Sequence, residues 1–364
     1  MNLPLYSYMP NYEAATGFLT DWWNGRKMPR PALFITAVKE IDPFLMLPLP
    51  HIEGVFDPNK SLKSAQYRLA YENNKIAGLE YFAEGMAIAN PTIGPSTYSY
   101  FFGGTPIEDR NTVWVDPWYK SILDIEIAFD ENNQYWRYQI DLLNRMMEFG
   151  KDKFVVAPPT TTDGLDILSS MLGPQQLLYD IMDHPDAVIE KNAAIGDFLL
   201  KMFDTVYKTI GCKGGGSIYL FWSEGKMLRH QCDFSAMLSP SLFRQFALPQ
   251  LRRTMGSVDH TIYHWDGPGA LCHLDALLET EEIDVIQWTP GAGIPPSHDR
   301  KWWKMYHKIL DSGKNIQIAT SSGVDEILLM KKEFGRDFPR FMIIFGRAFP
   351  SAKEAADAVE LLTL

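Results

Sequence analysis

Two residues that can do chemistry together stand two positions apart in the short β-type run Thr261–Asp266. They are His264 and Asp266, and side chains two apart on a strand point to the same side. Gly267–Gly269 (Gly-Pro-Gly) then turns the chain into a loop. A neutral imidazole can accept a proton or bind a metal, and a carboxylate can orient it or act as a second ligand. We therefore expect His264 and Asp266 to open together at a strand end.

Glu224 is the third member expected in this group. Together with His264 and Asp266 it would form a set of nitrogen and oxygen ligands for zinc or another divalent ion, with a position open to water or substrate. The same His-x-Asp pair also serves as a general base and its orienting carboxylate without any metal. A buried His–Asp pair with a purely structural role is the third interpretation. The residues alone leave these alternatives open.

Eight short apolar runs alternate with segments of helical periodicity, as expected for a (β/α)8 TIM barrel with strands buried on both faces. An open doubly wound sheet is the alternative, but Lys39–Pro43 after the first run is no glycine-rich phosphate loop. The predicted strands are Pro31–Val38, Gly85–Asn90, Lys153–Pro158, Gly216–Trp222, Thr261–His264, Asp284–Trp288, Asn315–Ala319 and Arg340–Phe345. The predicted helices include Asp130–Phe149, Leu177–Ile210, Pro240–Met255, Lys301–Leu310, Val324–Phe334 and Ser351–Leu362.

The predicted organisation is one barrel domain over 1–364, with residues 1–30 as an N-terminal extension. Two long connections, Gly94–Ile122 and Ser223–Leu238, are rich in glycine, proline, aromatic and charged residues, so we expect them to cover the mouth of the barrel. Substrate pockets of such barrels lie at the C-terminal ends of the strands. The polar and aromatic residues expected there are Asn90, Thr160, Trp222, Gln287, Trp288, Ser321 with Ser322, and Arg347.

Several of these residues have specific expected roles. Trp222 and Trp288 would stack on a planar or sugar-like substrate, whereas Trp265 alternates with His264 and should face the helical layer. Arg347 would clamp a carboxylate or phosphate through its guanidinium, or form a salt bridge to a loop carboxylate. Asp163 is expected to cap the helix that follows it.

Composition excludes several classes of protein. Hydrophobic residues make up 46% and charged residues 22% of the 364 residues, which is typical of a folded globular chain. The net charge of -11, without a basic run, disfavours nucleic acid and anionic membrane surfaces as partners. The three cysteines, Cys212, Cys232 and Cys272, lack metal or disulfide spacing and fit a reducing, cytoplasmic location. A homodimer is kept as one option for the assembly.

Common catalytic motifs do not occur in the chain. The sequence contains no Gly-x-Ser-x-Gly elbow, no Walker loop, no His-Glu-x-x-His and no EF-hand loop. Serine hydrolases, P-loop nucleotidases and ordinary zinc proteases are therefore set aside.

Four segments together resemble the uroporphyrinogen decarboxylase-like superfamily, which includes the decarboxylase and the corrinoid-dependent methyltransferases. Asp163–Gly173 followed by Leu177–Pro185 looks like the family's segment that ends in an acidic helix and a proline. Leu238–Pro249 is similar to its "SP..F..F..P" helix, and Tyr263-His264 to its fifth-strand histidine. Trp22–Arg30 extends the resemblance to the N-terminus. The resemblance implies a (β/α)8 barrel with a pocket at the strand C-termini.

Two departures bear on the activity that the resemblance implies. The decarboxylase binds its substrate's carboxylates through an arginine-rich N-terminal segment, where this chain has Pro29–Lys39. The methyltransferases bind zinc through His-x-Cys and a later cysteine, where this chain has His264, Asp266 and the serines at 321 and 322. Replacing soft thiolates by oxygen donors disfavours activation of a thiol acceptor by zinc.

The sequence therefore predicts a methyltransferase that moves a methyl group between a small substrate and a corrinoid protein. An acid for the departing oxygen would come from His264, Asp266 or Glu224. The alternative is a decarboxylase, another lyase or a hydrolase that acts on a small carboxylated or sugar-like compound by metal-assisted or acid–base chemistry. A non-catalytic ligand-binding barrel is the third class.

Overall fold

A seven-stranded, mostly parallel sheet forms the centre of the chain. The computed structural model describes residues 6–50, 64–108, 113–211, 216–321 and 323–363. The strand order is β2-β1-β13-β12-β11-β10-β9, in which only β2 runs antiparallel to its neighbour. The bounds are β1 Ala32–Val38, β2 Leu79–Ala83, β9 Met227–Gln231, β10 His260–Asp266, β11 Val285–Thr289, β12 Asn315–Thr320 and β13 Phe341–Phe345.

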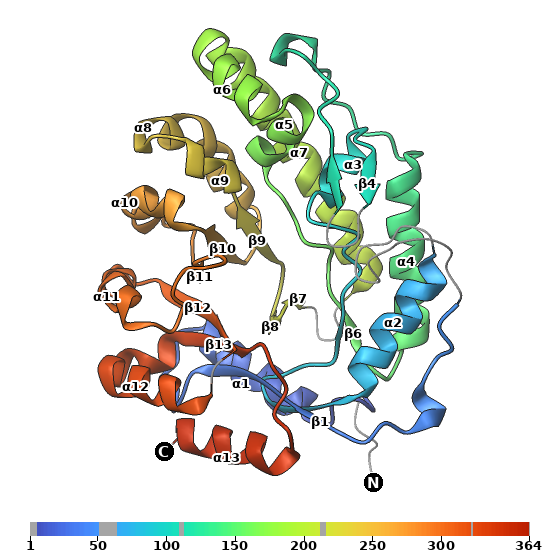
Figure 1. The fold of residues 1–364 in the computed structure, drawn as a ribbon, viewed down its shortest axis with the longest axis vertical. Coiled ribbons are helices and arrows are strands. Elements are labelled where there is room, and N and C mark those ends of the chain that lie inside the picture. Colours follow the sequence, from blue (N-terminus) through green and yellow to red (C-terminus); the bar gives the residue numbers. More distant parts are fainter. Residues whose placement is uncertain (1–5, 51–63, 109–112, 212–215, 322, 364) are drawn as a thin grey trace.

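A second, short parallel pair completes the inner strands. It consists of β3 (Ile88–Ala89) and β6 (Val155–Val156), which follow β1 in chain order. Figure 1 shows these strands arranged around the middle of the molecule with helices outside them. Six parallel strands of the large sheet together with this pair are compatible with a TIM-like barrel, although the described ladders do not close into one continuous sheet.

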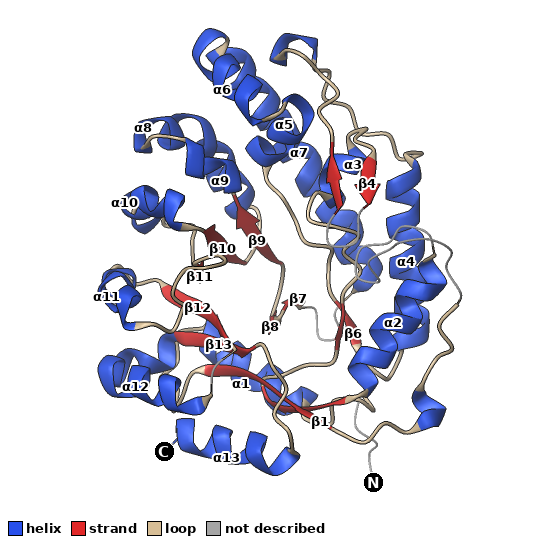
Figure 2. Cartoon of the chain, in the orientation of Figure 1, coloured by secondary structure: helices blue, strands red, loops and turns tan. Residues whose placement is uncertain are grey.

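Helices surround the strands, as Figure 2 shows. They alternate with the strands along the chain because apolar residues at helical spacing form a stripe that packs on the sheet. The main ones are α2 Ala65–Ala77, α4 Gln134–Gly150, α5 Gly164–Leu172, α6 Pro174–Asp183, α7 Pro185–Ile210, α9 Leu248–Met255, α10 Leu274–Leu278, α11 Trp303–Asp311, α12 Val324–Phe334 and α13 Ala352–Thr363. Among the described residues, none of the helices is both long and apolar enough to cross a bilayer.

The fourth predicted strand is wrong and is the main correction to the fold. Gly216–Trp222 does not form one strand, because the chain reverses at Leu220, which has a φ of +59°. The segment becomes the antiparallel hairpin of β7 (Ser217–Tyr219) and β8 (Phe221–Ser223). The strand that pairs with β10 is β9, which lies inside the predicted loop Ser223–Leu238.

The other long connection, Gly94–Ile122, also contains regular structure. It includes the short helix α3 (Thr97–Phe101) and the antiparallel pair of β4 (Pro106–Glu108) and β5 (Val113–Val115). Cys212 and Ser322 lie outside the described residues.

The N-terminal segment packs against the amino-terminal ends of the strands. Its helix α1 (Tyr12–Trp23) ends in two tryptophans. The indole of Trp22 donates to the Pro339 carbonyl just before β13, and that of Trp23 donates to the Trp222 carbonyl. The Trp23 ring also contacts His260, the first residue of β10.

A buried ion pair fastens the same segment to β1. Both terminal nitrogens of Arg30 donate to the Glu84 carboxylate, at 2.6 and 2.8 Å. The Leu33 backbone N–H donates to the same carboxylate at 2.9 Å. Glu84 is 2% exposed, so removing its cation would leave a buried carboxylate with only one N–H partner.

We predict that Arg30→Gln lowers the free energy of unfolding by about 3 kcal/mol, because it removes one partner of a buried pair. The matched control is Arg26→Gln, which breaks the exposed pair of Arg26 with Asp21 and should cost less than about 1 kcal/mol. Urea denaturation of both variants measures the difference. Equal losses would contradict the assigned importance of the Arg30–Glu84 pair.

Candidate functional site

The register of the parallel strands brings polar side chains into one row on the inner face. Gln231 of β9 pairs with His264 of β10, which pairs with Gln287 of β11, which pairs with Gln317 of β12. Residues at matching positions of adjacent strands point to the same face. The row therefore places His264 among amide side chains on the inner side of the sheet.

Hydrogen bonds join three members of this row, His264, Gln287 and Gln317, into a series that ends at the Met342 thioether. The Gln317 amide nitrogen donates to the Met342 sulfur, which can only accept, so the Gln317 carbonyl oxygen faces Gln287. The Gln287 amide nitrogen donates to that oxygen at 2.5 Å, which turns its own oxygen toward His264. The His264 Nδ1 lies 2.6 Å from the Gln287 oxygen and must carry the proton. Because Nδ1 carries the ring proton, the His264 Nε2 keeps a free lone pair.

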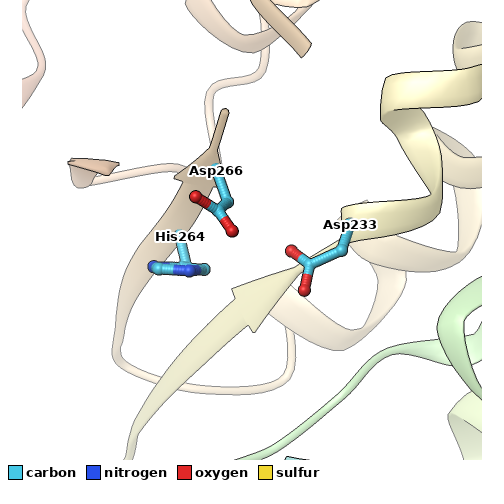
Figure 3. Close-up of side chains that lie close together, drawn as sticks. All are labelled: Asp233, His264 and Asp266. Atoms are coloured by element: carbon cyan, nitrogen blue, oxygen red, sulfur yellow. The ribbon is translucent and has the colours of Figure 1, made fainter. Parts of the chain in front are cut away.

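Two carboxylates lie beside this imidazole. Asp266, the last residue of β10, points to the same side as His264, and Asp233 follows the end of β9. One ligand atom from each of the three residues lies within 4.8 Å of the other two. Figure 3 shows the three side chains converging at the ends of the neighbouring strands. One nitrogen and two oxygen donors fit a divalent ion such as zinc, with positions left for water or substrate.

Burial sets the ionisation of these groups. Desolvation lowers the pKa of His264 to about 4, and the positive charge of Arg229 acts in the same direction. Desolvation raises the pKa of Asp233 and of Asp266, while Arg229 opposes the rise in both. His264 is therefore neutral at pH 7, as a ligand or a base must be. The raised pKa values of the two carboxyls suit either proton delivery or neutralisation by a cation.

The start of helix α5 holds the end of β9 in place. Asp163 accepts a hydrogen bond from the Gln231 backbone N–H at 2.9 Å, so its side chain does not cap α5 as predicted. Asp166 accepts from the backbone N–H groups of Asp233 and Phe234 at 3.1 and 2.9 Å. These two carboxylates fix the turn that carries Asp233.

Glu224 does not join His264 and Asp266, and Asp233 takes its place. Glu224 is exposed and lies three residues before the start of β9, whereas Asp233 follows the end of the same strand. The exchange follows from the fourth predicted strand, which ended at Trp222 and so placed Glu224 just after a strand end, whereas the strand that pairs with β10 ends at Gln231. The alternation of Arg229, Gln231 and Asp233 at every second residue was the signal that could have identified Asp233.

The two predicted stacking tryptophans lie away from the His264 group. Trp288 pairs in register with Trp265, and both face the helical layer, as the alternation predicts for Trp265. The Trp288 ring lies 4.9 Å from the rings of Trp265 and Trp302, so it packs between them. Trp222 is buried in the β7–β8 hairpin beside helix α1. Neither indole contributes to the inner row.

The remaining predicted substrate-binding residues occupy different places. Gln287 lies in the inner row, next to His264. Asn90 and Thr160 follow β3 and β6 and line one cavity of about 230 Å³. Ser321 and Arg347 follow β12 and β13 and are exposed. Cys232 is buried and Cys272 exposed, and neither belongs to the three-residue group.

Comparison with known proteins informs the fold alone. No protein-family model and no curated protein matches the chain. The structure is similar to that of a methyltransferase from Methanosarcina mazei, with a TM-score of 0.61 and 13% sequence identity. The similarity covers 96% of this chain and 98% of that chain. A likeness of this length shows a shared overall fold, and at this identity it assigns no residue a role.

We predict that His264 stays neutral down to pH 5, with Nδ1 protonated and Nε2 free. A group with a pKa of about 4 is only about one-tenth protonated at pH 5. The unfolded chain takes up this proton near pH 6.5, so the contribution of His264 to stability falls as the pH drops from about 6.5 to 4. Nitrogen-15 NMR of the ring, assigned by its loss in His264→Gln, measures both tautomer and titration.

Gln287→Leu is the matched test of the hydrogen-bond chain. It removes the acceptor for the Nδ1 proton, so we expect a mixture of both neutral tautomers at pH 7. Wild-type protein with an unprotonated Nδ1, or a His264 midpoint near 6.5, would contradict the assignment.

Proposed function

We propose that this chain is a methyltransferase that moves a methyl group between a small oxygen-containing substrate and a corrinoid protein. The observation that carries the proposal is the group of Asp233, His264 and Asp266 at the carboxyl ends of β9 and β10. We propose further that the parallel strands form a (β/α)8 barrel whose mouth holds this group. The fold shared with a methyltransferase supports the reaction class.

The donor set favours oxygen-linked methyl groups over thiols. All three ligand atoms are nitrogen or oxygen, and hard donors leave a divalent ion with strong Lewis acidity toward oxygen. A divalent ion held by His264 Nε2 and the two carboxylates would polarise the substrate oxygen. The corrinoid protein would supply the cobalt that accepts or returns the methyl group.

The residues of the chain have defined tasks in this proposal. Gln287 holds the proton on His264 Nδ1, so that Nε2 always faces the reaction with its lone pair. The half-buried Asp266 and the more accessible Asp233 lie on either side of the space where the substrate oxygen would bind. With the ion bound, both carboxylates would serve as ligands and the ion would stabilise the oxygen that loses its methyl group. Without the ion, a carboxyl with a raised pKa can deliver a proton to that oxygen instead.

A second candidate function is a decarboxylase, another lyase or a hydrolase that needs no corrinoid. The raised pKa values of Asp233 and Asp266 favour it, because two such carboxyls beside a neutral imidazole suit acid–base chemistry without a methyl acceptor. It would act on a small carboxylated or sugar-like compound. The two functions differ in whether turnover depends on the corrinoid protein.

We predict that zinc-loaded protein transfers a methyl group from a small methoxylated compound to a Co(I) corrinoid protein. The measurement is the appearance of methyl–cobalt absorption over a panel of methanol and aromatic methyl ethers. His264→Gln and Asp233→Asn should slow the transfer by at least about a hundredfold, because the first removes the imidazole nitrogen and the second removes the charge and the ionisable proton of the carboxyl. Glu224→Gln is the matched control and should retain the wild-type rate.

Three outcomes would overturn this function. Products formed equally fast without the corrinoid protein would establish the lyase or hydrolase instead. Equal rates for Glu224→Gln and Asp233→Asn, both slow, would show that the group is misassigned. An absence of turnover with every compound, together with unchanged ligand affinity in His264→Gln, would indicate a non-catalytic binding protein.

A further inference from the structure

Arg229 is a buried cation on the inner face of β9, next to the group of Asp233, His264 and Asp266. Its side chain is 6% exposed. It stands two residues before Gln231, and Gln231 pairs with His264, so both point to the inner side of the sheet. The positive charge of Arg229 lowers the pKa of Asp233, of His264 and of Asp266.

The partners of Arg229 are all neutral. Its Nη2 donates to the Gln231 side-chain oxygen at 2.5 Å and to the Thr161 carbonyl at 3.4 Å. The guanidinium carbon lies 5.1 Å from the centre of the Tyr219 ring. Within the part of the chain that the structure describes, the Arg229 Nε is buried without a hydrogen-bond partner, and no carboxylate forms an ion pair with this guanidinium.

A buried guanidinium with only neutral partners is costly. Moving a charged group out of water costs several kcal/mol unless an opposite charge and full hydrogen bonding offset the loss. Gln231, Thr161 and Tyr219 hold the side chain in one orientation and leave the Nε–H without an acceptor. A carboxylate placed at this guanidinium would supply both the missing opposite charge and an acceptor for the Nε–H.

A cavity that can hold a ligand lies next to Tyr219, the ring on which this arginine packs. Tyr219, which packs on the guanidinium, also lines the cavity of about 230 Å³ that contains Asn90 and Thr160. The rest of the lining is mainly apolar and includes Phe34, Met86 and Ile88. Its one cation among the described residues is Lys75, whose ammonium already pairs with the Glu72 carboxylate at 2.8 Å. The cavity thus offers apolar walls for the body of a molecule, one ring away from a cation that forms no ion pair among the described residues.

We propose that Arg229 binds the anionic head of a small acid whose apolar body occupies this cavity. The chemical class is an aryl or alkyl carboxylate, or an oxyanion of similar shape. The inference rests on the proposed function in one respect: the acid is the small substrate that Asp233, His264 and Asp266 act on. It assigns to Arg229 the anion clamp that the sequence suggested for the exposed Arg347.

The test measures binding of benzoate to the metal-free protein by calorimetry, with acetate, inorganic phosphate and benzyl alcohol as further probes. We expect benzoate to bind at least tenfold more tightly than acetate, which lacks the apolar body, and than benzyl alcohol, which lacks the charge. Phosphate should also bind more weakly than benzoate. Arg229→Gln should weaken benzoate binding at least tenfold, and Arg229→Lys should restore part of it.

Arg244→Gln is the matched control, because it removes one positive charge from an exposed arginine that pairs with Glu279. It should leave benzoate binding unchanged. A measurement on the wild-type chain avoids any dependence on how the variants fold: benzoate should shift the NMR signal of the Arg229 Nε–H, identified by its loss in Arg229→Lys.

Equal affinity for benzoate and benzyl alcohol, or an unmoved Nε–H signal at saturating benzoate, would overturn the proposal. Phosphate binding more tightly than benzoate would overturn the assigned ligand class. Because neither metal nor corrinoid is present, binding as expected together with failed methyl transfer would leave the anion site standing and reject only the reaction. Methyl transfer without benzoate binding would reject only the anion site.

Discussion

The alignment of four parallel strands is the constraint on which the rest of the site depends. It sets Gln231, His264, Gln287 and Gln317 side by side on the inner face of the sheet. A slip of one residue in any strand would turn its member of the row toward the helices. The outer face shows the same dependence, since Trp265 and Trp288 are aligned there and pack together. One register therefore separates the polar interior from the apolar layer.

Most strands and helices could be predicted because apolar runs and helical periodicity show which side chains are buried. Seven predicted strands overlap observed ones, for example Arg340–Phe345 with β13. Strand β9 escaped prediction because its sequence, Met-Leu-Arg-His-Gln, is polar although all five residues are buried. Its polar side chains face partners on both sides of the sheet, such as Asp163 for His230. A sequence pattern shows how hydrophobic a strand is. It does not show which partners in the fold allow polar side chains to be buried.

The same cause explains which site residues were found. His264 and Asp266 could be identified because their strand ends in a glycine–proline turn that marks the carboxyl end. Arg229 and Asp233 were missed because the first lies in the unrecognised strand β9 and the second follows its end. Trp288 was assigned to the substrate pocket because the sequence does not show how β11 is aligned with β10. In the structure Trp288 is aligned with Trp265, so it points to the helical layer. One local error in the fourth strand thus misplaced Trp222 and Glu224 and hid Arg229 and Asp233.

Electrostatics gives the inner face its chemical character. A cation at Arg229, two carboxyls with raised pKa and one neutral imidazole lie together on the inner face, where partial removal from water makes charges interact more strongly. The amide row fixes the imidazole tautomer, and the Asp163 and Asp166 carboxylates fix the turn that carries Asp233. The positions of the three donor groups are thus set by the fold before any ligand binds.

The most direct test of this account is the X-ray absorption spectrum of the zinc-loaded protein. The account predicts one equivalent of zinc bound by nitrogen and oxygen donors at about 2.0–2.2 Å, with no sulfur at about 2.3 Å. The histidine signature in the spectrum should vanish in His264→Gln. Zinc with a sulfur ligand, or a wild-type chain that retains no zinc, would contradict the claim that Asp233, His264 and Asp266 form a metal centre.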